Sequence, residues 1–501
     1  MKTIARFLAL LTGPSLRRSA RRVAFLGLSG FAVSALMAVP TATTSLAQFM
    51  SKKDERRIGE QEHPKIVQEF GGPYEDADVS SYLATIAGRM AMTSPINRNE
   101  FTFTVLNSPV VNAMALPGGY VYVTRGLLAL ANSEAEIAGV IGHEIGHVVE
   151  RHAAKRYNQS QWAGIGGLLA QVLTGSAAVG NLLGVGSTLF LLNNSRQDEY
   201  EADVRGTEYL AKAGYDPYAM SAFLGSLEMQ KALHAKIEGQ RYDPNRVEYL
   251  STHPNTLERQ RRALEQAKKT GITAGSRPDK ASAYFQAVDG LIYGDDPREG
   301  YVRGRTFSHP TLRFTFTVPE GFRLVNSSAH VDAVGPGETQ VRFDFGKNNA
   351  GSNMSRYVAD WGREVRLRDM QTYSVDGMNA ATAHTEVNTQ GGRRHLRLLA
   401  IAFSNTQVAR FQMLVPTNMV GQMTPQLQAM ANSFRRLASG EAQNLKPLRV
   451  RVVEVKRGDT VQSLAKRMAQ DDFKVDRFLA LNRLQSNATL TPGQKVKIVT
   501  E

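Results

Sequence analysis

The 501-residue sequence predicts an α+β protein of several domains. Residues 48–295 read mainly as amphipathic helices with one short strand-like stretch, whereas residues 300–440 carry the alternating apolar and polar runs of strands. Residues 449–500 hold short segments of both kinds between glycine turns. We therefore expect a mainly helical domain with a small sheet, an α+β sandwich and a small βααβ module. The chain has no cysteine, so these folds form without disulfides.

The first 47 residues predict a secretory signal peptide. They contain six basic residues and no acidic one, followed by an apolar run from Val23 to Pro40 and the small-residue sequence Ser45-Leu46-Ala47. An uncleaved membrane anchor is the alternative, because the apolar run is close to the minimum length that spans a bilayer.

A zinc-binding pattern lies in the first domain. The sequence HEIGH at 143–147 is the HExxH arrangement of zinc peptidases, and Ser133 upstream predicts the start of a helix. Residues four apart on a helix share a face, so His143 and His147 point toward one place with Glu144 beside them. One Zn²⁺ per chain then needs a third protein ligand and a free position for water, from which Glu144 takes the proton.

A third ligand is available downstream, in the sequence EYEAD at 199–203. Glu199 and Asp203 are four residues apart and share a helical face. We expect Glu199 to complete the ligand set and Asp203 to accept the second ring N–H of a ligand histidine. Glu201 is the rival ligand, but it lies on a different face from Asp203.

Four motifs in one order resemble the CAAX-protease-related zinc metallopeptidases, in particular their periplasmic BepA- and LoiP-like branch. They are NAMALPGGYVYVTRGL at 112–127, HEIGH at 143–147, EYEAD at 199–203 and STHPNTLER at 251–259. The resemblance covers about residues 58–262. It implies a periplasmic gluzincin in which His143, His147 and Glu199 bind zinc and Glu144 is the general base.

The resemblance also implies a substrate-binding strand. Residues 120–124 would form an edge strand along which an extended polypeptide pairs, and the sequence YVYVT suits a strand. The residues expected to contact substrate are Asn112, Tyr120, Val121, Tyr122 and Val123.

His253 and Arg259 match the last motif of the family. Two catalytic roles are open for His253: it donates to the developing oxyanion, or it is a fourth zinc ligand that occupies the water position and holds the enzyme inactive. A structural turn formed by the His-Pro pair is the third possibility. Arg259 is expected to support the ligands. We expect His152 to point away from the ligand face.

Two further segments connect the motifs to the C-terminus. Residues 157–195 carry no charge and predict two tightly packed helices, with a membrane contact as the alternative. Residues 300–440 predict strands at 312–319, 341–345, 395–403 and 408–415 and helices near 354–367 and 425–437. This domain resembles the PsbP- and MOG-like fold and contains no catalytic constellation.

After a polar linker around residues 439–446, the last fifty residues resemble a LysM domain. That resemblance implies binding of N-acetylglucosamine-containing glycans, hence peptidoglycan, with protein contact alone as the alternative. The glycan-binding residues it implies are Gly458, Asp459, Thr460, Asn482, Pro492 and Gly493. Because the linker is polar and the catalytic residues all precede residue 260, we expect the module to be separable from the peptidase.

Two functional classes follow from these observations. In the first, a periplasmic zinc metalloendopeptidase, retained on peptidoglycan and in peripheral contact with the membrane, degrades unfolded or misassembled envelope proteins beside the outer-membrane assembly machinery. In the second, the chain is a chaperone-like or peptidoglycan-binding assembly factor with a normally closed zinc site. The net charge of +14 falls to +8 without the six cations of residues 1–47, which favours anionic envelope partners. No nucleic-acid-binding module is present, so nucleic acid is excluded as a partner.

Overall fold

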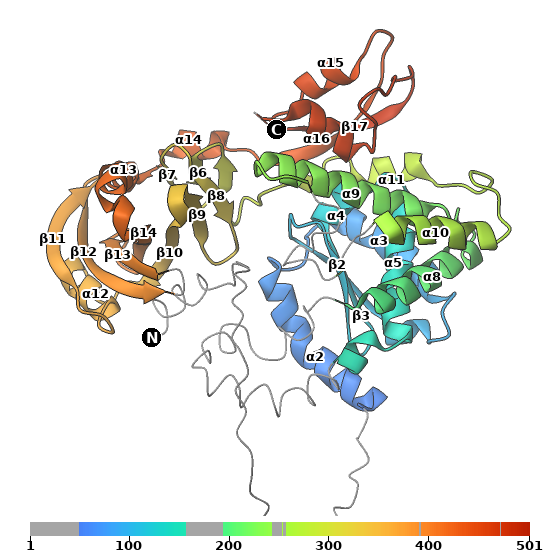
Figure 1. Ribbon diagram of the computed structural model, residues 1–501, viewed down its shortest axis with the longest axis horizontal. Coiled ribbons are helices and arrows are strands. Elements are labelled where there is room, and N and C mark those ends of the chain that lie inside the picture. The colour runs from blue at the N-terminus through green and yellow to red at the C-terminus, as the bar shows by residue number, and fades with distance from the viewer. Residues whose placement is uncertain (1–49, 157–193, 243–252, 254–256, 390–391, 471) are drawn as a thin grey trace, which may run out of the picture.

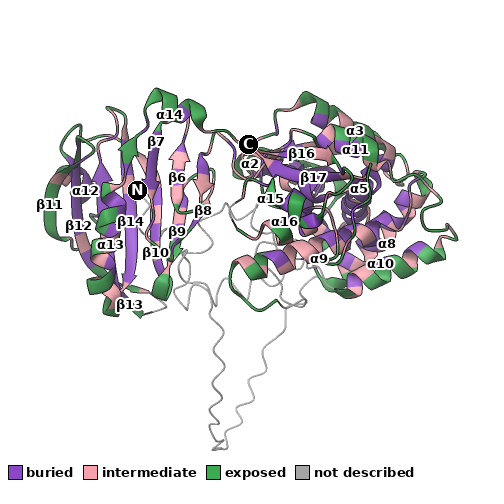
Figure 2. Ribbon diagram, turned by 90° about the horizontal axis from the view of Figure 1, so that it is seen from above, coloured by how far each residue is buried: buried purple, intermediate pink, exposed green. Residues whose placement is uncertain are grey.

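The computed structural model describes residues 50–156, 194–242, 253, 257–389, 392–470 and 472–501. Figure 1 shows a helical body (blue to green), a β-rich body beside it (gold to orange) and the C-terminal segment (red) above the helical body. Seen from above, the two bodies lie side by side (Figure 2). The protein is therefore α+β, as predicted. The expected signal peptide and the uncharged helix pair lie outside the described residues. No helix of the described part is long and apolar enough to cross a membrane.

The helical body positions the HExxH and EYEAD motifs on separate helices. In its described part the helices are α2 (Lys52–Glu69), α3 (Ala77–Ala91), α4 (Arg125–Leu130), α5 (Glu134–Val149), α8 (Arg196–Lys212), α9 (Ala219–Ile237), α10 (Leu257–Lys269) and α11 (Ala281–Val288). Serine side chains begin both motif-bearing helices: Ser133 accepts from the Glu136 N–H, and Ser195 accepts from the Asp198 N–H. The Glu136 carboxylate accepts from the Asn132 N–H, one residue before the cap.

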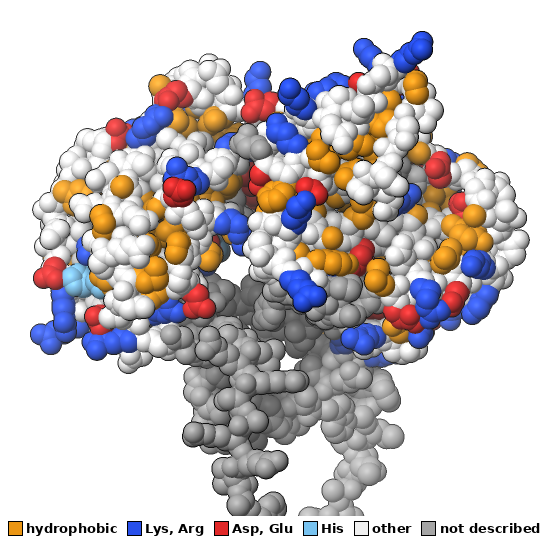
Figure 3. Space-filling model, turned by 45° about the horizontal axis from the view of Figure 1, so that its top comes forward, with side chains coloured by type: hydrophobic (Ala, Val, Ile, Leu, Met, Phe, Trp, Pro, Cys, Tyr) orange, Lys and Arg blue, Asp and Glu red, His pale blue; other side chains and the backbone are white. Residues whose placement is uncertain are grey.

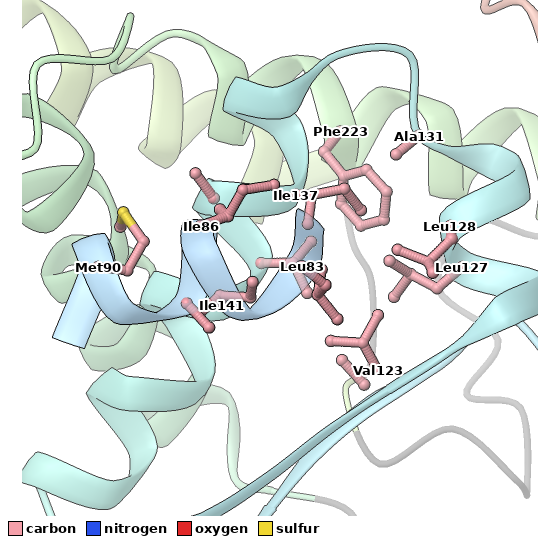
Figure 4. Packing of buried hydrophobic residues seen from close by; sticks show 14 of the residues in the cluster. Leu83, Ile86, Met90, Val123, Leu127, Leu128, Ala131, Ile137, Ile141 and Phe223 are labelled. Atoms are coloured by element: carbon pink, nitrogen blue, oxygen red, sulfur yellow. The ribbon is translucent and has the colours of Figure 1, made fainter. Parts of the chain in front are cut away.

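Glycines bring α5 and α8 close together. A Cβ atom at Gly142 would lie 3.2 Å from the Gly206 Cα, and one at Gly146 would lie 3.2 Å from the Ala202 Cα. Backbones that approach this closely leave no room for larger side chains, so the two motifs face each other across a narrow gap. The opposite side of α5 packs into the main core, where Ile137 and Ile141 meet α3 and α9 (Figure 4).

The expectation that residues 120–124 form an edge strand is wrong. The small sheet has the order β1-β3-β2, with β1 (Thr102–Leu106), β2 (Ala113–Leu116) and β3 (Tyr120–Thr124). Tyr120, Val121, Tyr122 and Val123 therefore lie in the central strand, and all five residues of β3 are buried. Gly118 and Gly119, with φ near +80° and +85°, turn the chain back so that β2 covers the outer side of β3. The edge strands are β1 and β2.

The β-rich body is a sandwich, as the alternating runs predict. A seven-stranded sheet has the order β11 (Arg368–Val375), β12 (Met378–Thr389), β13 (Gly392–Ile401), β14 (Gln407–Pro416), β10 (Thr339–Lys347), β9 (Val331–Gly335) and β8 (Arg323–Asn326). A four-stranded sheet has the order β15 (Arg435–Arg436), β7 (Phe314–Thr317), β6 (Thr306–His309) and β5 (Tyr301–Arg303). The smaller sheet and α13 (Val420–Asn432) cover one face of the larger sheet, and α12 (Met354–Trp361) covers the other.

The C-terminal segment has the predicted βααβ order: β16 (Leu448–Glu454), α15 (Val461–Lys466), α16 (Lys474–Leu481) and β17 (Lys495–Thr500). The expectation that this segment can be separated from the peptidase stays a prediction, and the structure shows that the two are in contact. Strand β16 pairs with β4 (Ile292–Tyr293) of the helical body, and Val450 is buried in the core of that body. The segment before it is also ordered, because α14 (Ser439–Asn444) occupies the expected linker.

Candidate metal centre

Four side chains converge between α5 and α8. The Glu199 carboxylate lies 3.6 Å from His143 Nε2 and 3.4 Å from His147 Nε2. His253 joins them, with its Nδ1 atom 3.0 Å from a Glu199 oxygen and 3.2 Å from His143 Nε2. One donor atom from each residue lies within 4.8 Å of the others. Imidazole nitrogens with one carboxylate are the donor set of zinc and related transition metals, so these residues fit a shared cation.

Arg259 compensates the buried acids of the centre. Its Nη1 atom lies 2.6 Å from a Glu199 oxygen, and its Nε and Nη2 atoms each donate to Asp203 at 2.8 Å. Burial disfavours the ionised form of Glu199, but His253 and Arg259 outweigh it and lower the pKa of Glu199 well below its usual value. For Asp203, burial is likewise outweighed by Arg259, which lowers its pKa. Both carboxylates are therefore charged.

The ligand histidines are held in orientation by their second ring nitrogens. Asp203 Oδ1 lies 2.8 Å from His143 Nδ1, which turns Nε2 of that ring toward the cluster. Burial lowers the pKa of His147 well below its usual value, so this ring stays neutral, as a metal ligand must.

Glu144 is a buried acid of the centre with one oxygen that forms no hydrogen bond in the described structure. It is 1 % exposed, its Oε1 atom lies 3.3 Å from His253 Nε2, and its Oε2 atom has no hydrogen-bond partner in the described structure. Burial raises the pKa of Glu144, an effect that His253 and His143 partly oppose. A buried carboxylate with one unbonded oxygen and a raised pKa can accept a proton from a small molecule that enters the site.

His253 bridges the ligands and Glu144. Burial disfavours its imidazolium, but Glu199 and Glu144 outweigh burial and raise the pKa of His253. The structure therefore brings His253 into the donor cluster and within reach of Glu144, while Arg259 supports two of the acids. Glu201 is not in the cluster.

Sequence reasoning missed two residues. His152 Nδ1 lies 2.7 Å from His147 Nδ1, and its Nε2 lies 3.3 Å from Glu201. The expectation that His152 points away is wrong, because α5 ends at Val149 and Arg151, with φ of 56°, turns the chain back. Asn194 is the second: its Nδ2 atom donates to Glu199 at 2.6 Å and lies 3.3 Å from His147 Nε2. No spacing rule for helices places either residue.

Two cavities meet at Glu144 and His253, which line both. The larger, of about 770 Å³, runs along α9 and includes Asn112 and Ala113. The smaller, of about 20 Å³, is bounded by the other end of β2 and by His147. Strand β2, at one edge of the small sheet, thus contributes residues to both cavities, which Glu144 also lines.

The remaining predicted residues lie away from the centre. Tyr120 to Val123 line neither cavity. In the C-terminal segment, Gly458 and Gly493 occupy turns with φ near +90°, Asp459 accepts from the Lys456 N–H, and Thr460 caps α15. The Asn482 carboxamide is committed to the backbone of Phe478 and Lys497.

Comparison with known proteins finds family matches in two segments of the chain. Residues 77–267 match peptidase family M48, and residues 453–499 match the LysM domain. The mitochondrial metalloendopeptidase OMA1 of Arabidopsis thaliana is 38% identical over 170 residues, which cover 34% of this chain and 32% of that protein. The β-barrel assembly-enhancing protease of Escherichia coli K12 is 28% identical over 228 residues, or 43% of this chain and 44% of that protein. The chain thus spans less than half the length of these two relatives.

Solved structures resemble a smaller part of the chain. Cyanobacterial PsbP from Synechocystis sp. PCC 6803 is 12% identical, covers 28% of this chain and 98% of its own, and has a TM-score of 0.22. The yeast Ran-binding protein Mog1p is 13% identical, covers 27% of this chain and 96% of its own, and has a TM-score of 0.21. The centre formed by His143, His147, Glu199 and His253 thus lies within the segment of the helical body that matches peptidase family M48, and a segment that matches the LysM domain follows near the C-terminus.

Proposed function

We propose that the protein is a zinc-dependent metalloendopeptidase. The observation that carries this proposal is the position of Glu144: a buried carboxylate with an unbonded oxygen stands beside the donor cluster, where two cavities meet. His143, His147 and Glu199 would hold one Zn²⁺ per chain. Zinc bound there supplies a Lewis acid that polarises the scissile carbonyl.

The residues of the chain account for the proton transfers. Glu144 Oε2 takes the proton of the attacking water and then delivers it to the leaving nitrogen of the peptide. Asp203 and His152 keep the ligand rings turned inward, and Arg259 keeps Glu199 and Asp203 ionised. His253, in the same donor cluster, would restrain the centre in its resting state by occupying the fourth position.

We propose β2 as the strand that binds substrate. The Thr124 N–H donates to the Asn112 carbonyl, so the alternation of an antiparallel pair directs the backbone groups of Ala113 and Ala115 away from β3. An extended polypeptide can add to this edge and place one peptide bond beside Glu144. Such binding suits unfolded chains, because a folded protein offers no free strand of this length.

The proposed setting is the bacterial envelope. The predicted signal peptide of residues 1–47, the LysM domain and the similarity to the β-barrel assembly-enhancing protease support a periplasmic enzyme of protein quality control that is retained on peptidoglycan. Misassembled envelope proteins would be its substrates. A chaperone-like role with a closed centre is the second candidate, and the contacts of His253 with Glu144 and Glu199 favour it.

The test is proteolysis of an unfolded outer-membrane β-barrel protein, with the metal content of each variant measured in parallel. Glu144→Gln should retain zinc and lose hydrolysis, whereas His147→Ala should lose both. Glu364→Gln, which changes an exposed acid in the β-rich body, is the matched control and should retain both. Cleavage by Glu144→Gln at the wild-type rate would refute the mechanism.

A further inference from the structure

The LysM region is joined to the peptidase body by backbone bonds. The Gly290 N–H donates to the Val450 carbonyl at 2.8 Å, and the Val450 N–H donates to the Leu291 carbonyl at 2.9 Å. These bonds extend the LysM sheet to three strands in the order β17-β16-β4. In Figure 3 the C-terminal region, at the upper right, lies directly against the helical body.

A buried lysine fixes this contact to the wall of the active-site cleft. Lys497 is 0 % exposed, and its Nζ atom donates to the carbonyls of Ala129, Leu130 and Ala131 at 2.7, 3.0 and 2.6 Å. These carbonyls lie at the C-terminal end of α4, where no further helical turn supplies N–H groups to donate to them. The LysM region therefore caps a helix that lines the large cavity with Gly126, Leu127, Ala129 and Leu130.

One face of α9 leads from the metal centre to the LysM region. Met220, Phe223 and Leu227 line the cavity beside α5, and Lys231 and His234 continue the same face. At the far end Lys236 pairs with Asp476 of α16 at 2.7 Å, and Arg477 and Leu481 of α16 line the cavity itself. From Met220 to His234 a helix rises about 21 Å, a distance that about six extended residues span.

We propose that helix α16 of the LysM region forms the far wall of the substrate cleft, so that a polypeptide bound for cleavage contacts Arg477. This inference rests on the proposed function. The cleft between the metal centre and α16 is lined mainly by apolar side chains. Its far end carries the cations Lys231, Arg241 and Arg477 and the carboxylate of Glu238, and Asp472 pairs with Arg477 at 2.8 Å, so the cations remain in excess. An unfolded segment with apolar residues near the scissile bond and an acidic residue about six positions away fits these walls.

Photo-crosslinking in the full-length Glu144→Gln protein tests the contact, because this variant binds substrate without cleaving it. The photoreactive amino acid p-benzoylphenylalanine replaces Arg477 in one protein and Val110 in another. Val110 is 46 % exposed and lines the cleft near the metal centre. In the matched control, p-benzoylphenylalanine replaces Arg467. This residue is exposed at the end of α15 in the same LysM region and lines neither cavity. The probe is reduced, carboxymethylated α-lactalbumin, an acidic unfolded polypeptide.

We expect substrate adducts at positions 110 and 477, and an adduct yield at position 467 that is at least tenfold lower. Adducts at 110 without any at 477 would overturn the proposed wall and leave the peptidase assignment intact. Equal yields at 467 and 477 would also overturn it, because contact would then be unspecific. Absence of adducts at 110 and 477, together with no cleavage by the wild-type protein, would overturn both proposals.

Discussion

Arg259 is the residue on which the ionisation of the metal centre depends. The carboxylates of Glu144, Glu199 and Asp203 and three imidazoles lie close together, and removing such charges from water is costly unless each is paired. Arg259 provides three N–H groups to Glu199 and Asp203. Glu144 alone is left outside this pairing, and its pKa is raised. Within one buried site, Glu199 and Asp203 therefore stay ionised, whereas Glu144 can exchange protons.

The two possible roles of His253 predict opposite effects of the substitution His253→Ala on the rate of proteolysis. If His253 restrains the centre, His253→Ala should raise the basal rate of proteolysis severalfold, because the fourth position becomes free while His143, His147 and Glu199 remain. The initial rate of casein cleavage is the measurement, with His330→Ala in the β-rich body as the control. A loss of about a hundredfold would instead assign His253 to the oxyanion.

Helical spacing predicts the ligands and Asp203 but not the other residues that support them. His143, Glu144, His147, Glu199 and Asp203 follow from residues four apart on two helices, and the structure brings them together as that spacing requires. His152 escaped prediction because its position depends on the left-handed conformation of Arg151, which no glycine signals in the sequence. Asn194 and His253 lie outside the helices, so helical periodicity cannot predict where their side chains point.

At the scale of elements, the composition of a strand did not reveal its place in the sheet. YVYVT in β3 has the branched and aromatic residues that suit either position, and burial on both faces places it in the centre. The PGG sequence before β3 is the informative feature, because it makes a hairpin with β2. The central position of β3 therefore results from the turn, which places β2 on one side, and from β1, which pairs with β3 on the other side.

Blocking one N–H on β2 should weaken substrate binding. Ala115→Pro removes an outward-facing donor and should lower kcat/KM for an unfolded polypeptide about five- to tenfold, the value of one backbone hydrogen bond of about 1 kcal/mol. Ala115→Ser keeps the N–H and is the control. Unchanged kcat/KM in the proline variant, with its circular dichroism spectrum intact, would show that substrate does not pair with β2.

The sandwich should lose stability in acid through His309 of β6. Burial lowers the pKa of His309 to about 4, and its Nδ1 accepts from the Leu312 N–H, which requires the neutral ring. An unfolded histidine titrates near 6.5, so between these pH values the unfolded state binds more protons. The free energy of unfolding is therefore greatest above pH 6.5 and falls by up to about 3 kcal/mol as the pH approaches 4.

His309→Asn keeps an acceptor for Leu312 and removes this titration. In a Trp162→Phe background Trp361 is the remaining tryptophan, and it reports on the β-rich body. Urea unfolding at pH 7.5 and 4.5 should show a smaller acid loss in the variant. His395, whose pKa burial also lowers to about 4, keeps its effect in both proteins. Equal losses would exclude His309 as a source of acid sensitivity.

At the scale of the whole molecule, sequence predicted the modules but not how they join. The polar residues around 439–446 indicated a linker, whereas Lys497, an ordinary strand residue by its position, is buried against α4 of the other module. A contact between residues more than 360 positions apart leaves no periodic signal. The LysM pattern alone therefore gave no indication of the contacts that join the two modules.

Lys497→Met should loosen this junction. The methionine fills the space but leaves three carbonyls without a donor, which should lower the free energy of unfolding of the joined modules by about 2 to 4 kcal/mol. Thermal unfolding followed by circular dichroism is the measurement. Lys466→Met, on the exposed surface of α15, should leave the transition unchanged. If Lys497→Met also leaves it unchanged, the two modules unfold independently.

The central claim, a single zinc served by Glu144, is tested most directly by restoring metal to stripped protein. Zinc is removed with a chelator, added back in steps, and the cleavage of an unfolded envelope protein is measured at each step. The account predicts no cleavage without metal, a linear rise that ends at one zinc per chain, and no cleavage at any step for Glu144→Gln. Full activity in the stripped protein, or restoration of Glu144→Gln by zinc, would contradict it.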